Sequence, residues 1–106
     1  MMYKVVITKP AEEDLRKAVS YIANDLKNVI AAKNLLDEVE KTINSLSEMP
    51  KRYHIVDDEL LAIHGIRMVQ IKNYLAFYIV REETKSVTVL RFLYARRDWL
   101  NILKNT

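Results

Sequence analysis

The sequence contains no cysteine and only one glycine and two prolines among its 106 residues. Without cysteine the chain has no disulfide, no thiolate nucleophile and no cysteine-ligated zinc site, which fits a reducing compartment. A single glycine is too few for a glycine-rich phosphate-binding loop, and this excludes most familiar nucleotide-binding loops. No serine lies in a glycine-flanked nucleophile elbow, so the common hydrolase motif is missing as well.

Long apolar runs are also missing. The first fifteen residues contain one short apolar stretch, which is broken by Thr8, Lys9 and Pro10. This is unlike a signal peptide, and no span of the chain approaches the eighteen apolar residues of a membrane helix. We therefore expect a cytoplasmic protein that does not interact with a membrane.

The overall composition is typical of a globular domain. Half of the residues are apolar and 29% are charged, and the net charge is +3. A chain of this length forms one domain, here residues 1–106, that buries roughly two-thirds of the surface its unfolded chain exposes. Residues 49–106 carry ten Lys or Arg against six Asp or Glu, whereas residues 11–48 are acidic overall. A polyanionic partner should therefore meet the C-terminal half.

The N-terminal half predicts a strand followed by a helical hairpin. Tyr3–Lys9 is short and β-branched, as a strand would be. Pro10 suits a first helical position, and acidic residues follow it where a helix N-terminus favours negative charge. Apolar residues then recur at three-and-four spacing to Leu26, and a second such stripe runs from Ala32 to the helix stop at Pro50. Two antiparallel helices with a shared apolar side are expected.

The C-terminal half predicts a three-stranded antiparallel meander. Three segments rich in β-branched and aromatic residues are separated by turn-length polar breaks: Gly65–Lys72, Tyr74–Glu82 and Ser86–Ala95. The region 49–64 reads as a loop with a short strand around Leu60–Ile63, and residues 99–103 as a segment packed against the core. The predicted fold is α+β with a β-α-α-β-β-β order and the helices on one face of the sheet.

The two histidines give a weak indication of a metal site. His54 and His64 flank an acidic stretch, and imidazole and carboxylate groups are common metal ligands. No recognised spacing such as HExxH is present, so a solvated acidic loop is the favoured interpretation. We expect neither a metal nor another cofactor.

The arginines indicate more. Arg67 and Arg91 each interrupt an apolar strand, which is costly unless the side chain meets solvent or a partner. Alternation places Arg67 beside Val69 and Ile71, and it places Arg91 on one face with Val87, Val89 and Leu93. Arg96 and Arg97 follow the last strand, between Tyr94 and Trp99. Fixed guanidinium groups beside aromatic rings suit phosphates and stacked bases, while the alternative is a set of ordinary rim charges paired with Asp98 or Glu82.

Four segments together resemble one protein family. They are the opening YKVVITKPAEEDLRKAVSYIA, the helix ending INSLSEMP, the strand pair GIRMVQIKNYLAFYIV and the closing VTVLRFLYARRDW. In this order and register they are similar to the RelE/ParE superfamily of bacterial type II toxin-antitoxin toxins. The resemblance implies a growth-inhibiting toxin that forms a hetero-oligomer with an acidic, DNA-binding antitoxin. RelE-like members cleave mRNA on the ribosome without a metal, and ParE-like members inhibit DNA gyrase. From the sequence we expect ribosome-dependent mRNA cleavage, with inhibition of gyrase as the alternative.

For a RelE-like toxin, the resemblance assigns roles to specific residues. Arg67 and Arg97 would stabilise charge on the phosphorus, and Tyr94 stands where many relatives have a histidine that could serve as acid or base. Tyr94 could equally be a buried strand residue. The remaining RNA contacts would come from four basic residues: Arg91, Arg96, Lys51 and Arg52.

The sequence departs from the RelE pattern in two features, and the first of them favours the other branch. The predicted helices are longer than those of RelE and closer to those of ParE, and the tyrosine that RelE carries near its C-terminus appears as Leu103. The ParE branch implies no catalytic residues, so the basic C-terminal segment would be the place where such a toxin meets gyrase. In either case an acidic, partly helical antitoxin segment would cover the cationic cleft and the apolar sheet edge.

Overall fold

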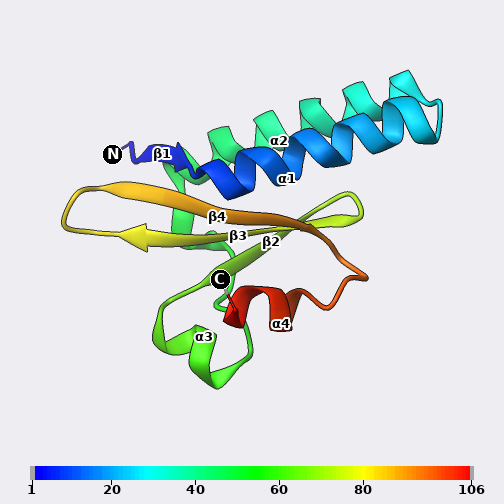
Figure 1. Ribbon diagram of the computed structural model, residues 1–106. Coiled ribbons are helices and arrows are strands. Elements are labelled where there is room, and N and C mark those ends of the chain that lie inside the picture. The colour runs from blue at the N-terminus through cyan, green and yellow to red at the C-terminus, as the bar shows by residue number, and fades with distance from the viewer. Residues whose placement is uncertain (1, 106) are drawn as a thin grey trace.

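The structure, a computed structural model, describes residues 2–105 as a four-stranded sheet with helices on both faces (Figure 1). The elements, in chain order, are β1 (Lys4–Ile7), α1 (Lys9–Ser20), the π-helical segment η1 (Tyr21–Asp25), α2 (Val29–Glu48), the 3-10 turn η2 (Pro50–Arg52), α3 (Glu59–Ile63), β2 (Arg67–Ile71), β3 (Tyr74–Arg81), β4 (Ser86–Tyr94) and α4 (Trp99–Lys104). The predicted β-α-α-β-β-β order is confirmed, with two short helices added.

The hairpin helices begin at capped N-termini. The side chain of Thr8 accepts a hydrogen bond from the amide of Ala11, and that of Asn28 accepts one from the amide of Ala31. The first predicted helix continues through η1, whose wider turns extend it to Asp25. Within residues 2–105, no helix is long and apolar enough to cross a membrane.

The sheet has the order β1-β4-β3-β2, with β1 parallel to β4 and the other neighbours antiparallel. A bulge interrupts the ladder between β3 and β4, where Phe77 pairs with Arg91 but Tyr78 pairs with Val89. Leu90 is therefore an extra residue on β4. Our prediction from simple alternation was wrong here, because Phe92 and not Leu93 shares a face with Val89.

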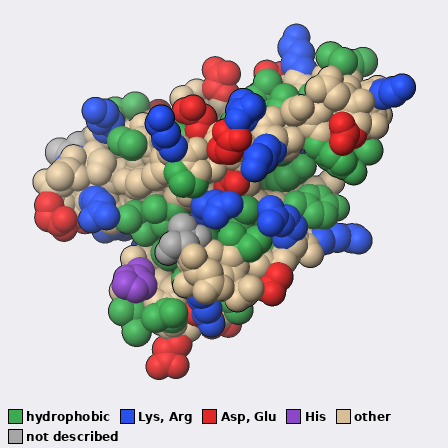
Figure 2. Space-filling view, viewed as in Figure 1, with side chains coloured by type: hydrophobic (Ala, Val, Ile, Leu, Met, Phe, Trp, Pro, Cys, Tyr) green, Lys and Arg blue, Asp and Glu red, His purple; other side chains and the backbone are tan. Residues whose placement is uncertain are grey.

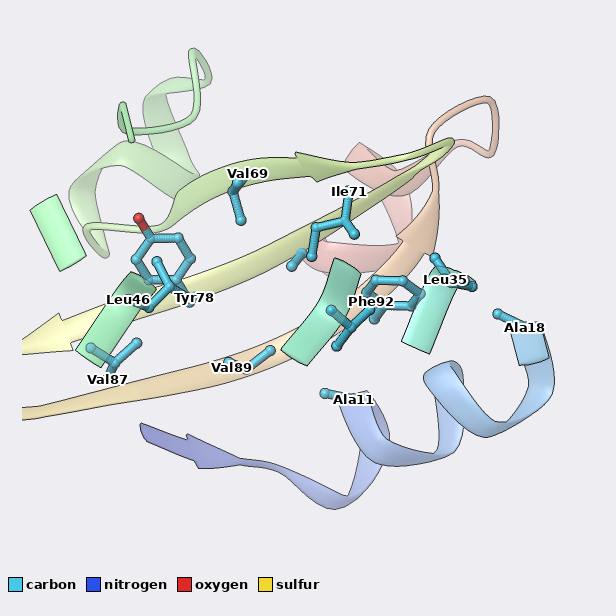
Figure 3. Close-up of a cluster of buried hydrophobic side chains, with 12 residues drawn as sticks. Ala11, Ala18, Leu35, Leu46, Val69, Ile71, Tyr78, Val87, Val89 and Phe92 are labelled. Atoms are coloured by element: carbon cyan, nitrogen blue, oxygen red, sulfur yellow. The ribbon is translucent and has the colours of Figure 1, made fainter. Parts of the chain in front are cut away.

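Each face of the sheet has its own hydrophobic core. Figure 3 shows Ala11 and Leu35 of the hairpin facing Ile71 and Phe92 of the sheet. Tyr78 is fully buried in this core and donates a 2.7 Å hydrogen bond to the carbonyl of Pro50. Its burial raises the pKa of Tyr78 to about 12, so the hydroxyl stays protonated and keeps the loop after α2 against the sheet.

Helices α3 and α4 cover the opposite face (Figure 1). Asp58 caps α3 by accepting from the amide of Leu61, and this cap explains why residues 60–63 form a helix where we predicted a short strand. Trp99 of α4 packs against Phe77 with 5.2 Å between ring centroids, and Leu103 is buried. The prediction that the C-terminal segment packs against the core is confirmed.

A polar cluster at Glu82 joins the N-terminal strand to the turn after β3. The carboxylate forms ion pairs with Lys51 at 2.7 Å and with Lys85 at 2.9 Å, and it accepts a hydrogen bond from the Tyr3 hydroxyl at 2.9 Å. Hydrogen bonds from Lys51, Lys85 and Tyr3 lower the pKa of Glu82 to about 2. The charged form is therefore favoured in the folded protein.

This cluster predicts a specific loss of stability in acid. A carboxyl group whose pKa is lower in the folded than in the unfolded chain stabilises the fold above the unfolded value, near 4.5, and loses this contribution as pH falls to about 2. We expect the free energy of unfolding, measured by urea titration, to fall between pH 5 and pH 2. This fall should be smaller in Glu82→Gln than in the unsubstituted protein. Glu83→Gln, at an exposed neighbouring acid, is the matched control. Identical pH profiles for Glu82→Gln and the unsubstituted protein would contradict the prediction.

Candidate functional site

The structure places the predicted site residues in three separate regions. Arg67 lies beside the turn η2 together with Lys51. Arg91 faces helix α1, where it pairs with an acid of that helix. Tyr94 and Arg97 lie at the other end of the sheet, in a cleft beneath the hairpin. The predicted residues thus form no single constellation.

Arg67 binds backbone carbonyls of the segment that precedes β2. Its Nη1 donates to the carbonyl of Tyr53 at 2.7 Å and to that of Lys51 at 3.4 Å. Lys51 pairs with Glu82, and Arg52 donates to the Ser45 hydroxyl at 3.1 Å. These three cations hold η2 and the following loop in place.

Arg91 forms a bidentate ion pair with Asp14 of α1. The Nε–Oδ2 distance is 2.6 Å and the Nη2–Oδ1 distance is 2.9 Å, and the two side chains are only 19% and 12% exposed. The amide of Phe92 also donates to Asp14, at 3.0 Å. The hydrogen bonds that Arg91 donates to the Asp14 carboxylate, together with its negative charge, raise the pKa of Arg91 against the opposing effect of burial, so the guanidinium keeps its charge.

Sequence reasoning missed Asp14 as a structural residue. A signal was present, because Asp14 lies three positions after Ala11 and four before Ala18, and both alanines are buried. An acid on the apolar stripe of a helix needs a buried partner. Arg91 on the last strand is that partner.

Tyr94 and Arg97 line a cleft of about 630 Å³ between the hairpin and the end of the sheet. The ring of Tyr74 stacks on Phe92 with 4.9 Å between centroids, and it meets Tyr94 edge-on at 5.5 Å. Burial is the main cause of a raised pKa of Tyr74, and the nearby hydroxyls of Tyr94 and Tyr21 add to it. Tyr94 itself is 38% exposed, so of our two alternatives for this residue the buried strand position is wrong.

The two arginines after β4 are exposed. Within residues 2–105, the side chains of Arg96 and Arg97 have no hydrogen bond or ion pair. Asp98, which we considered as a partner, instead accepts a hydrogen bond from the amide of Asn101 and caps α4. The cations of this segment therefore remain available to a ligand.

Strand register separates Arg67 from the cleft. Arg67 is the first residue of β2 and pairs with Tyr78, while Ile71 at the other end pairs with Tyr74, which in turn pairs with Tyr94. Four residues of strand span roughly 13 Å. Arg67 therefore lies level with the middle of β3, whereas Arg97 follows the end of β4, and the two do not line one pocket.

His54 and His64 are both exposed. Across the described part of the chain, no group of three His, Asp or Glu side chains lies close enough to hold a metal ion. His64 instead lines a second cleft, of about 740 Å³, on the α3–α4 side of the sheet, together with Arg81, Arg91 and Lys104. Of these cations, Lys104 pairs with Asp58 at 3.1 Å.

Comparison with known families gives one match that covers most of the chain. The sequence model of the ParE toxin of type II toxin-antitoxin systems, parDE, matches residues 5–99. No curated relative matches the chain.

Solved structures of toxins share the fold. A chain of the RelBE2 toxin-antitoxin complex of Mycobacterium tuberculosis has a TM-score of 0.64 and 24% identity, over 89% of this chain and 99% of that one. For the chromosomal ParDE system of P. aeruginosa the TM-score is 0.71, with 16% identity over 90% and 98% of the two chains. An arginine double mutant of E. coli RelE in the free state has a TM-score of 0.66, with 15% identity over 99% and 98%.

The Asp14–Arg91 pair predicts a large effect from a small change. Asp14→Asn removes the charge that balances Arg91 and weakens the bond to the amide of Phe92. We expect the free energy of unfolding in urea to fall by about 2–3 kcal/mol. Asp37→Asn, at an exposed acid of α2, is the control and should change stability by at most about 0.5 kcal/mol. Equal effects of the two substitutions would show that the ion pair contributes nothing.

Proposed function

Because the chain belongs to the family of ParE toxins of type II toxin-antitoxin systems, we propose that it inhibits bacterial growth by binding DNA gyrase and that a cognate antitoxin neutralises it. The observation that carries the choice of target is the use of Arg67 and Arg91. Of the arginines predicted to bind phosphate, the two that lie within strands are engaged in contacts within the protein, Arg67 with backbone carbonyls and Arg91 with Asp14.

RNA cleavage places strict demands on a site. A 2′-hydroxyl that attacks the adjacent phosphate needs a base, a proton donor for the leaving oxygen and cations on the developing charge, all within hydrogen-bond reach of one phosphate. Here Arg67 holds backbone carbonyls near η2 and lies roughly 13 Å along the sheet from the level of Tyr94. This distribution supports action by binding over action by catalysis.

The exposed basic segment after β4 is the surface that we assign to the target. Arg96 and Arg97 project from the turn between β4 and α4, and Asp98 is engaged as a helix cap. Exposed arginines are well suited to an interface because their guanidinium groups bind carboxylates and phosphates in a bidentate manner. Gyrase bound to DNA offers both groups.

Two exposed features suit an antitoxin. The end of the hairpin exposes apolar side chains that a monomeric protein would normally cover: Tyr21, Leu26, Val29 and Ile30. Of the unpaired cations after β4, Arg97 lies across the cleft from this end of the hairpin. An acidic, partly helical antitoxin segment would cover both, and the similar chains of M. tuberculosis and P. aeruginosa come from toxin-antitoxin systems.

Ribosome-dependent mRNA cleavage is the second candidate. One observation favours it: the exposed hydroxyl of Tyr94 lines the same cleft as the unpaired guanidinium of Arg97. Such a pair has the chemistry of a general acid and a phosphate ligand. A ribosomal partner would have to supply the remaining groups.

The two candidates predict opposite outcomes in paired assays of the same protein. We expect the purified toxin to inhibit supercoiling by gyrase, and the double substitution Arg96→Ala/Arg97→Ala to raise the inhibitory concentration at least tenfold. Primer extension after induction should show intact messages. The control is Lys33→Ala/Lys41→Ala, which removes the same charge from the exposed surface of α2. Unimpaired supercoiling, together with cuts in translated messages that depend on Tyr94 and Arg97, would refute the gyrase proposal in favour of RNA cleavage.

A further inference from the structure

Apart from Arg97, the cleft beneath the hairpin is lined by residues that the gyrase proposal does not use. Its volume of about 630 Å³ lies within the range of small-molecule sites. One wall comes from α1, η1 and the start of α2, and the other comes from the β2–β3 turn and the end of β4 (Figure 1). Figure 2 shows Lys and Arg side chains beside hydrophobic ones where the end of the sheet passes below the hairpin.

Aromatic rings line both walls. Tyr21 projects from η1 and is 51% exposed, and Tyr94 projects from the end of β4 and is 38% exposed. Tyr74 lies between the strands and is held by its stacking on Phe92. Exposed tyrosine rings on a rigid support are the platforms on which proteins stack unpaired nucleobases.

The π-helical turn contributes to this wall. The amide of Leu26 bonds to the carbonyl of Tyr21 at 3.0 Å, five residues back, where an α-helix would bond four back. This wider turn changes the register of the helix after Ser20, and both Tyr21 and Ile22 line the cleft. Such π-helical turns are frequent at functional sites.

The electrostatic field of the cleft is positive. Lys17 lines the helical wall and Arg97 the sheet wall, and neither forms an ion pair with another residue of the described chain. The acid among the lining residues is Asp14, and Arg91 already neutralises it. Two unpaired cations on opposite walls favour an anion with several oxygen atoms.

Side-chain amides supply the remaining group that base recognition needs. Asn28 and Asn73 both line the cleft. The Oδ1 of Asn28 accepts a hydrogen bond from the amide of Ala31 at 3.0 Å and caps α2, so the Nδ2 group takes no part in the cap. Amide groups pair with the donor and acceptor edges of nucleobases.

We propose that this cleft binds a nucleobase together with its phosphate, with the base stacked on Tyr21 and Tyr94 and the phosphate held by Lys17 and Arg97. The ligand is either a free nucleotide or one unstacked residue of a single-stranded nucleic acid, since both present a flat ring and a phosphate. The proposal rests on the geometry of the cleft and holds whether or not gyrase is the target. A purely acidic peptide is disfavoured because it offers no ring to the exposed tyrosines.

The test is equilibrium binding to the full chain, freed from its antitoxin, with defined probes. Fluorescence anisotropy would follow fluorescein-labelled six-nucleotide single strands of RNA and DNA, and calorimetry would follow AMP, GMP, adenosine and inorganic phosphate. We expect Tyr21→Ala and Lys17→Ala each to raise the dissociation constant at least tenfold, while Tyr21→Phe retains binding. Lys41→Ala on the far side of the hairpin is the charge control, and circular dichroism confirms that each variant is folded.

The probes separate the two sources of the ligand. Competition by AMP or GMP at concentrations near their own dissociation constants indicates a free nucleotide, whereas binding of the oligonucleotides alone indicates a nucleic-acid strand. Binding that is unchanged in both Tyr21→Ala and Lys17→Ala overturns the proposal. So does equal affinity for inorganic phosphate and AMP, or binding of a hexaglutamate peptide but of no nucleotide probe, because the tyrosines would then have no role.

Discussion

The fold depends on how the chain completes the exposed edge of β4. Strand β1 is only four residues long and pairs with β4 no further than Val89. Beyond it, Thr8 donates to the carbonyls of Val89 and Leu90, and Asp14 accepts from the amide of Phe92 while it binds Arg91. Side chains of the chain that enters α1 thus satisfy the edge that a longer strand would have paired. This interaction fixes the hairpin against the sheet.

The same interaction decides which cations remain available. Asp14 is the acid that lines the cleft beneath the hairpin, and its carboxylate is already paired with Arg91. Arg67 likewise donates to the carbonyl of Tyr53 after η2, and its register places it level with the middle of β3, away from the cleft. Arg97, beside exposed tyrosines, forms no ion pair within residues 2–105. The same residue, Asp14, thus takes part in a structural ion pair and lines the proposed ligand-binding cleft.

Under these proposals, the cleft would connect two partners of this small domain, its ligand and the antitoxin. Its walls belong to segments far apart in sequence, the hairpin near Tyr21 and the end of the sheet near Tyr94. Binding of a ligand between them would therefore depend on how the two walls are placed relative to each other. The apolar end of the hairpin lies beside it. An antitoxin segment that covers the hairpin end would also close the mouth of the cleft, and this links neutralisation to ligand access.

Much of the fold was determined by the sequence itself. The three-and-four spacing of apolar residues up to Leu26 predicted the hairpin, and the β-branched segments predicted the meander, because both patterns express local geometry. The site was not determined in this way. The bulge at Leu90, the pairing of Arg91 with Asp14 and the separation of Arg67 from Arg97 each join residues many positions apart. Only the packed structure decides such contacts, because the sequence shows which charges exist but not which of them already have a partner.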